Sequence, residues 1–223
     1  MSEIDALNAV FDRRYSCRAF KPDPVLEDTL QQIIKTAGKT ASWCNAQPWQ
    51  VLITQGPATN AFRDGLKTAA QSSDPTPDFP WPEGYPGVYG DRRRTCGYQL
   101  YEAAGIARDD RAGRAAQSFR NFELFDAPHV AIIHTEAALG PYGALDCGGF
   151  VTAFMLAATS LGVATIAQAS VAAYPDFIRR HFDLEENRLI LCAISMGYAD
   201  ADHPANSFRT DRADVLDIVD LRG

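Results

Sequence analysis

The sequence predicts a single α+β domain. Helix-like and strand-like segments follow one another without the regular strand–helix repeat of a doubly wound parallel sheet. One uncharged stretch in the second half is too long for a strand and indicates a buried helix. The 223 residues are 46% hydrophobic and 22% charged, which is ordinary for a globular protein with a sizeable core. We therefore expect one domain over residues 1–223.

The N-terminal part contains three predicted helices and one strand. Apolar residues recur at helical spacing over 3–14 and 25–37. The short apolar run VLITQ, residues 51–55, predicts a buried strand. Residues 58–71 return to a helical pattern.

Residues 72–87 follow neither the helical nor the strand pattern of the preceding segments. The segment SSDPTPDFPWPEGYPG contains five prolines and two glycines, so it forms neither a regular helix nor a central strand. Its aromatic residues are too numerous for a solvated linker and indicate an ordered loop that packs on the domain, or a lid. Polar segments at 91–105 and 109–123 are expected to be helical. We interpret 72–125 as an insertion that forms a lid or substrate region.

The remaining elements form the rest of the core. HVAIIHT, residues 129–135, predicts a strand, and residues 143–162 predict a long buried helix. Gly148 and Gly149 lie inside this helix, where each costs about 1 kcal/mol relative to alanine. A close approach of another helix, such as one across a subunit interface, could offset that cost. The last three predicted elements are a strand over 163–168, a short helix over 174–182 and a strand over 188–199.

Charge and cysteine content narrow the class of protein. The net charge of −7 argues against general nucleic-acid binding, which leaves a basic footprint. Five cysteines with no CxxC pair indicate a reducing cytoplasm rather than a disulfide framework. The start of the chain lacks the basic and apolar regions of a signal peptide. We expect a cytoplasmic protein.

Membrane and metal sites are not expected. The uncharged stretch from Cys147 to Pro175 is long enough to cross a bilayer. However, polar residues interrupt it and no positively charged anchor flanks it, so a buried helix and strand are favoured. The sequence contains no dinucleotide-binding glycine motif, phosphate-binding loop, serine nucleophile elbow or zinc-protease motif. Its four histidines do not group with other ligands.

Three separated segments concentrate arginine, amide and aromatic residues: RRYSCRAF (13–20), ASWCNAQPWQ (41–50) and NSFRTDR (206–212). Each has an ordinary explanation on its own. The first arginines could form a solvated helix end, and Ser16 could be a helix cap. Cys17 and Cys44 are most simply small buried residues.

Together and in this order, the segments resemble the FMN-dependent nitroreductase family. The resemblance rests on RRYSCRAF, NAQPWQVLI, LGVATIAQAS, RLILCAISMGYAD and FRTDRADVLDIV, and it extends over nearly the whole chain except 72–125. It implies a mostly antiparallel central sheet flanked by helices. It also implies an intertwined homodimer with a long buried interface helix.

The resemblance further implies a site for FMN between the subunits. Guanidinium groups suit the phosphate, which places Arg14 and Arg212 there with Ser16. Arg18 is expected to stabilise the reduced ring. The AQAS segment departs from the glycine pair of the family, which affects the expected backbone contact to flavin N5. The implied cofactor-binding residues are Arg14, Tyr15, Ser16, Arg18, Ser42, Trp43, Asn45, Gln168, Ala169, Arg209 and Arg212, with Ser42, Trp43 and Asn45 supplied by the partner subunit.

The implied activity is transfer of hydride from NADH or NADPH through FMN to nitroaromatic compounds or quinones, in a ping-pong mechanism. No side chain stands out as a catalytic acid or base. Tyr85, Tyr89 and Tyr98 are expected in the substrate pocket. Two alternatives remain open: a reductive dehalogenase of the same fold, and a flavin-binding module without turnover. The sequence does not separate NADH from NADPH, nor does it identify the substrate.

Overall fold

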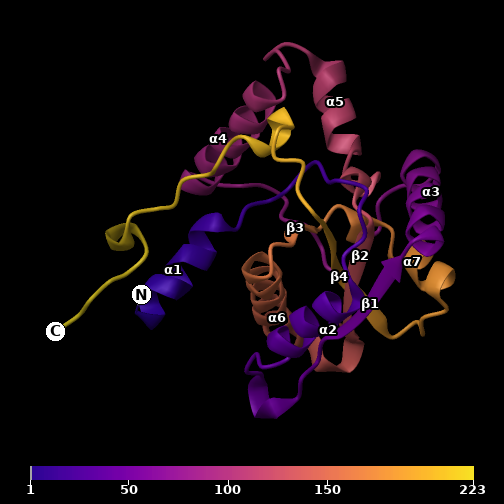
Figure 1. Ribbon diagram of the computed structural model, residues 1–223, viewed down its shortest axis with the longest axis horizontal. Helices are drawn as coiled ribbons and strands as arrows, with labels where there is room; N and C mark the ends of the chain where they lie inside the picture. Colours follow the sequence, from indigo (N-terminus) through magenta and orange to yellow (C-terminus); the bar gives the residue numbers. More distant parts are fainter. Residues whose placement is uncertain (1) are drawn as a thin grey trace.

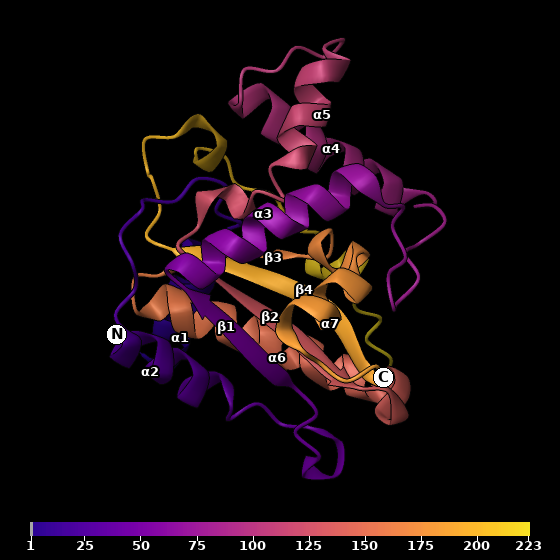
Figure 2. The same ribbon diagram turned by 90° about the vertical axis from the view of Figure 1, so that its right-hand side faces the viewer.

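The computed structural model describes residues 2–223 and has a four-stranded sheet at its centre (Figures 1 and 2). The strands lie in the order β1, β2, β4, β3, and every neighbouring pair is antiparallel. This arrangement confirms the predicted α+β fold with an antiparallel sheet. The strand bounds are Gln50–Gln55 for β1, His129–Glu136 for β2, Ala164–Gln168 for β3 and Arg188–Gly197 for β4.

Helices α2 (Glu27–Ala37) and α6 (Gly140–Ser160) cover one face of the sheet. Ile33 of α2 and Phe154 of α6 are fully buried there, together with Ile133 of β2. Alternate strand residues point to opposite faces, so the residue before Ile133 in β2, Ile132, contributes to the other side.

Helices α3 (Pro57–Ser72) and α7 (Pro175–Phe182) cover that second face. Their fully buried side chains include Phe62 and Ile178, which pack with Ile132 of β2. The sheet is therefore buried on both sides, which fixes the strand register and makes it a rigid support for the loops at its ends.

Residues 88–119, within the predicted insertion, form an arm at one end of the molecule (Figures 1 and 2). It contains α4 (Val88–Ala103) and α5 (Arg111–Phe119), and among their residues only Gly90 is buried. The preceding loop is ordered, because the Asp78 carboxylate accepts hydrogen bonds from Arg179 at 2.7 Å and from the Ile190 N–H at 2.8 Å. This loop therefore packs against α7 and β4. The sequence had two interpretations, a loop packed on the domain or a lid, and this contact agrees with the first.

Several predicted helix bounds differ from the observed ones by a few residues, most clearly at two helices. The helix predicted over 109–123 spans Arg111–Phe119, and the chain then enters turns in which Leu124, Phe125 and Asp126 take positive φ values of 56°, 51° and 61°. These residues turn the chain so that Leu124 and Phe125 are buried. The long helix predicted over 143–162 spans 140–160 instead, and Gly162 ends the turn after it at φ 77°.

Among residues 2–223, one stretch, Ala137–Ser160, is long and apolar enough to span a membrane by length and composition. In the fold, α6 occupies this stretch and supplies the central helix of the core beside α2. Its two glycines differ in surroundings. A Cβ on Gly149 would lie 3.3 Å from Thr40, whereas a Cβ on Gly148 would meet nothing within 4 Å.

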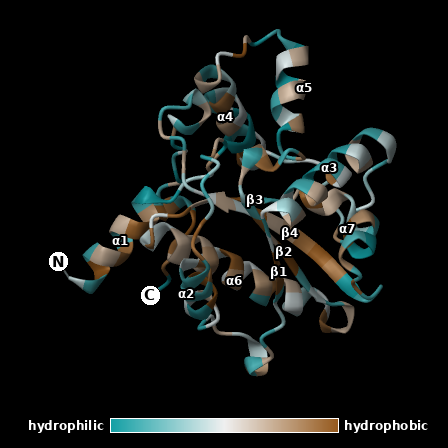
Figure 3. Ribbon diagram, turned by 45° about the vertical axis from the view of Figure 1, so that its right-hand side comes forward, coloured by the Kyte–Doolittle hydropathy of each residue, from teal (hydrophilic) through white to brown (hydrophobic). Residues whose placement is uncertain are grey.

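Helix α1 (Glu3–Arg13) projects from the body and buries none of its residues (Figure 3). The Ser2 and Asp5 side chains cap its first turn reciprocally. Ile4, Leu7 and Phe11 form an apolar stripe along it, and each of these side chains is about half exposed or more. The C-terminal tail carries further exposed apolar residues, including Leu216 and Leu221.

Candidate functional site

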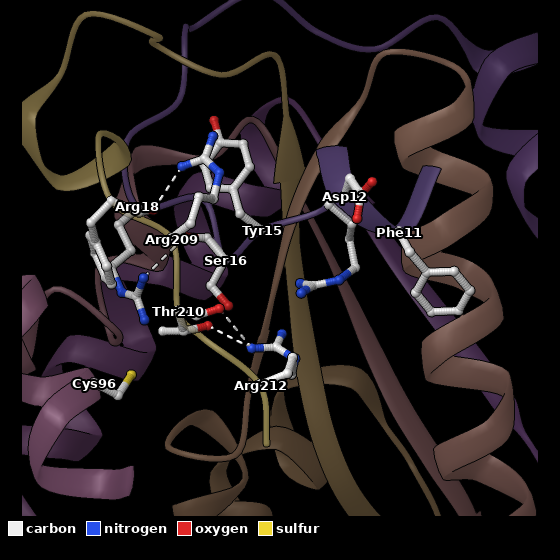
Figure 4. A pocket seen from close by; sticks show the side chains of 11 residues that line it. Phe11, Asp12, Tyr15, Ser16, Arg18, Cys96, Arg209, Thr210 and Arg212 are labelled. Atoms are coloured by element: carbon white, nitrogen blue, oxygen red, sulfur yellow. Dashed lines mark hydrogen bonds between the residues drawn. The ribbon is translucent and has the colours of Figure 1, made fainter. Parts of the chain in front are cut away.

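The segments RRYSCRAF and NSFRTDR lie side by side and enclose a cavity of about 480 Å³, which we call the arginine pocket (Figure 4). The first segment leaves the end of α1 in an extended form. It continues the sheet through a bridge between Ser16 and Thr165 and a second bridge between Phe20 and Ala199. The lining residues are Phe11, Asp12, Arg14, Tyr15, Ser16, Arg18, Cys96, Phe208, Arg209, Thr210 and Arg212.

Asn206 joins the two segments. Its side-chain amide donates to the carbonyls of Ala19 at 2.9 Å and Asp200 at 2.8 Å, and its oxygen accepts from the Arg18 N–H at 2.7 Å. The side chain is buried. Our sequence reasoning assigned Asn206 no role, although it is the first residue of the segment that we singled out.

Backbone carbonyls and aromatic rings orient the arginines. The Arg18 guanidinium donates to the Ser16 carbonyl at 3.0 Å and lies 5.5 Å from the centre of the Phe208 ring. The Arg209 guanidinium lies 3.7 Å above the centre of the Tyr15 ring. Arg212 donates to the hydroxyl of Thr210 at 2.9 Å.

The pocket is strongly electropositive. Across residues 2–223, none of Arg14, Arg18, Arg209 and Arg212 forms an ion pair with a carboxylate. Burial lowers the pKa of Arg14, and repulsion from Arg212 lowers it further. Burial also lowers the pKa of Arg18. Partly buried cations without a carboxylate partner are the arrangement expected of a site that receives an anion.

The second predicted segment lies elsewhere in the protomer. Trp43 and Asn45 belong to a short 3₁₀ turn, η1 (Trp43–Asn45), at the end of the molecule opposite the α4–α5 arm (Figure 1). The Trp43 N–H donates to Asp146 of α6 at 3.0 Å, and the Ser42 hydroxyl accepts from the Gln47 N–H at 2.9 Å. Within one chain, these residues do not line the arginine pocket.

One prediction about this turn, the burial of Cys44, was wrong. Cys44 is exposed, whereas Cys17 is fully buried as expected. Cys44, Asn45 and Gln47 all have positive φ, near 50°, in the left-handed region of backbone conformation that turns the chain sharply. The side chains of a turn held in this way are available to a surface beyond the chain itself.

Gln168 and Ala169 lie at the end of β3. The Gln168 side chain is buried away from the arginine pocket: it donates to the Asn121 carbonyl at 2.9 Å and accepts from the Ser195 hydroxyl at 2.5 Å. Ala169 is exposed. The Gln168 side chain is therefore engaged within the protein, and the predicted backbone contact of this pair to a cofactor stays a prediction.

The three predicted substrate tyrosines are all exposed on the insertion. Tyr85 lies under the guanidinium of Arg93, 5.2 Å from it, and Tyr89 is the second residue of α4. Tyr98 lines a different cavity, together with Arg108. None of the three lines the arginine pocket.

Comparison with known proteins places this geometry in context. The Nitroreductase family model matches residues 12–198. Nitroreductase NfnB of Mycolicibacterium smegmatis is 38% identical over 211 residues, covering 92% of this chain and 88% of the relative. A 4-nitrobenzoate reductase of Pseudomonas putida is 33% identical over 208 residues, covering 93% and 92%.

Two solved structures of similar proteins have the same fold as this chain. The FMN-dependent nitroreductase NfnB from Mycobacterium smegmatis in complex with NADPH superposes with a TM-score of 0.95 at 34% identity, over 100% of both chains. The FMN and NADPH-dependent nitroreductase NfnB from sphigopyxis sp. strain HMH gives a TM-score of 0.93 at 30% identity, over 97% of this chain and 99% of the other.

Proposed function

The chain belongs to the nitroreductase family, and on that premise we propose that it is an FMN-dependent enzyme that oxidises NAD(P)H and reduces nitroaromatic compounds or quinones. The observation that carries the proposal is the arginine pocket, in which four guanidinium groups meet without a carboxylate partner among residues 2–223. Such a charge favours the binding of an anion, and the phosphate of FMN is one that guanidinium forks fit well.

The residues present fit this cofactor. Arg14, Arg212 and Ser16 would bind its phosphate, since all three line the pocket and two of them repel one another until an anion is bound. Arg18 would lie against the ring system, held by the Ser16 carbonyl and the Asn206 side chain. FMN, when bound, supplies the hydride-accepting and electron-donating chemistry.

The chain itself contributes position and charge. A cation fixed by backbone contacts stabilises negative charge without reorganising during the reaction, which is the role we propose for Arg18. Asp12 is the one carboxylate among the lining residues, and it is exposed. The proposed mechanism therefore takes its protons from solvent. It is ping-pong, because donor and acceptor would use the same open side of the pocket in turn.

We also propose that the site is completed in a homodimer. Ser42, Trp43 and Asn45 lie at the far end of the protomer from the arginine pocket, so a second copy would have to bring them to it. The apolar stripe of α1 and the apolar residues of the tail are exposed in one chain. Contiguous exposed apolar surface of this kind is typical of a protein interface.

The phosphate assignment is tested by FMN titration. Arg14→Ala and Arg212→Ala should each weaken FMN binding by about 2 kcal/mol, because each removes a charge-assisted contact. Arg13→Ala is the matched control, since Arg13 is the neighbouring arginine but does not line the pocket. Unchanged affinity in both pocket variants would refute the assignment.

Steady-state assays separate the proposed reaction from its alternatives. A nitroarene should be reduced with NADPH or NADH, with parallel double-reciprocal plots. Turnover of a halotyrosine without any reduction of a nitroarene would instead establish the dehalogenase alternative. A flavin-loaded protein that NAD(P)H does not reduce would establish the module without turnover.

A further inference from the structure

The α4–α5 arm carries a second cavity, of about 370 Å³, which we call the tyrosine–arginine cavity. It lies between the end of α4 and the start of α5, outside the arginine pocket. Its lining residues are Tyr98, Tyr101, Glu102, Ile106, Arg108 and Arg114.

Each arginine of this cavity is held against a tyrosine. The Arg108 guanidinium lies 4.8 Å from the centre of the Tyr98 ring and donates to the Tyr98 hydroxyl at 3.4 Å. The Arg114 guanidinium lies 6.0 Å from the centre of the Tyr101 ring, and its Nε donates to the Asp110 carbonyl at 3.3 Å. Stacking on a ring orients a guanidinium while leaving its outer N–H groups available.

The charge of the arm favours an anion here. Residues 88–119 contain six arginines and four carboxylates, in a chain whose net charge is −7. Within the described chain, neither Arg108 nor Arg114 forms an ion pair. Asp91 is paired with Arg94, and Asp110 caps α5 through the Gly113 N–H. Glu102 is the one carboxylate among the lining residues, and Asp109, next to Arg108 in the chain, is exposed.

The combination of two guanidinium groups with two aromatic rings indicates a specific class of ligand. A planar ring can lie against the tyrosines, and a dianionic group can pair with both arginines. The adenosine 2′-phosphate of NADPH has both parts, whereas NADH lacks the phosphate. A singly charged aromatic carboxylate would need only one of the two arginines.

We propose that the tyrosine–arginine cavity binds the adenosine 2′-phosphate end of NADPH and makes the enzyme prefer NADPH to NADH. This inference rests on the proposed function, because it assigns one end of the hydride donor. Cys96 of the arginine pocket and Tyr98 of this cavity are two residues apart on α4, so the two cavities lie at nearly the same height along the helix but on different sides of it. An extended dinucleotide that reaches from one cavity to the other would therefore pass across α4.

The direct test is binding of adenosine 2′,5′-bisphosphate to the FMN-loaded protein by calorimetry, which requires no turnover. Arg108→Ala and Arg114→Ala should each weaken it about ten- to hundredfold, with FMN content unchanged. Arg108→Lys should lose less, because it keeps the charge. Arg111→Ala, an exposed arginine of α5 outside the cavity, should behave like the unaltered protein. Equal affinity of all variants would overturn the proposal.

Kinetics provide a second readout. In Arg108→Ala and Arg114→Ala, kcat/KM should fall for NADPH and stay within about twofold for NADH, since only NADPH carries the 2′-phosphate. An equal fall for both donors would overturn the proposal. A rise in KM confined to 4-nitrobenzoate, and absent for nitrobenzene, would overturn it in favour of substrate carboxylate recognition. If the bisphosphate binds as expected but no nitroarene is reduced, the proposed function fails and this site stands.

Discussion

At the residue scale, Cys147 shows how burial controls the chemistry of a side chain. Its thiol is fully buried where α6 packs on the sheet. Burial raises its pKa to about 11; a hydrogen bond with Thr135 lowers the value and the nearby charge of Asp146 raises it further. The neutral thiol is therefore the form that the fold stabilises at physiological pH.

This shift predicts a loss of stability in alkali. The ordinary pKa of a cysteine thiol is about 9. Above that pH, Cys147 of an unfolded chain releases its proton, while Cys147 of the folded chain retains it up to about pH 11. The unfolded state then binds fewer protons, so the free energy of unfolding should fall between pH 9 and pH 11. Urea titrations under reducing conditions should show this slope, and Cys147→Ala should make it shallower. An identical slope in both proteins would contradict the attribution.

The arginines of the site were predictable from sequence because their chemistry is local. Arg14, Arg18 and Arg212 stand in short segments that were assigned to a cofactor site through their resemblance to a family, and all three line one pocket. Asn206 was not predictable, because its role depends on meeting Ala19 and Arg18 nearly two hundred residues earlier in the chain. Cys44 was predicted wrongly because its positive φ leaves no trace in the residue type.

At the element scale, a largely buried ion pair and two hydrogen bonds hold the loop before α4: the Ile190 N–H donates to Asp78, and the Thr76 N–H donates to the Ala173 carbonyl. Asp78 and Arg179 have side chains that are only 11% and 14% exposed, and Arg179 also donates to the Arg188 carbonyl at 3.0 Å. The abundance of proline predicted an irregular loop, and its aromatic residues suggested packing on the domain as one of two interpretations. The pairing of Asp78 with Arg179 could not be predicted, since the two residues are 101 positions apart.

Asp78→Ala should destabilise the protein by about 3 kcal/mol, because it leaves a buried guanidinium and the Ile190 N–H without their partner. The loop should also become sensitive to proteases. Asp176→Ala is the matched control: Asp176 binds the same Arg179 but is 66% exposed, so its loss should cost less than about 1 kcal/mol. Urea unfolding and limited proteolysis measure both effects, and equal losses would contradict the role of burial.

At the scale of the whole molecule, the single chain leaves much of its apolar surface uncovered. No residue of α1 is buried, and the space beside Gly148 on α6 is open to a neighbouring backbone. The pattern of each helix was readable from sequence, because apolar spacing determines which residues share a face. Which apolar faces meet the chain's own core and which remain free depends on three-dimensional packing.

If the protein is a homodimer whose interface buries α1, one charge introduced on α1 should separate the subunits. Leu7→Asp should raise the dimer dissociation constant by at least about tenfold and reduce FMN content, because a buried unpaired carboxylate is unfavourable. The subunit should still fold, since Leu7 is exposed in one chain. Thr68→Asp, on an exposed position of α3 across the sheet, is the control. Light scattering after gel filtration would contradict the dimer if all three proteins behaved as monomers with full flavin.

The position of Asn206 has a practical consequence. Beyond it, the chain is largely exposed to its end, yet this stretch carries Arg209 and Arg212. Trimming by a protease at Ser207 would remove both arginines together while leaving the buried core of the sheet and its helices in place. Under the proposed function, the yellow colour of a preparation would then report whether its C-termini are intact. Pale protein that still unfolds in a cooperative thermal transition would indicate clipped ends rather than misfolding.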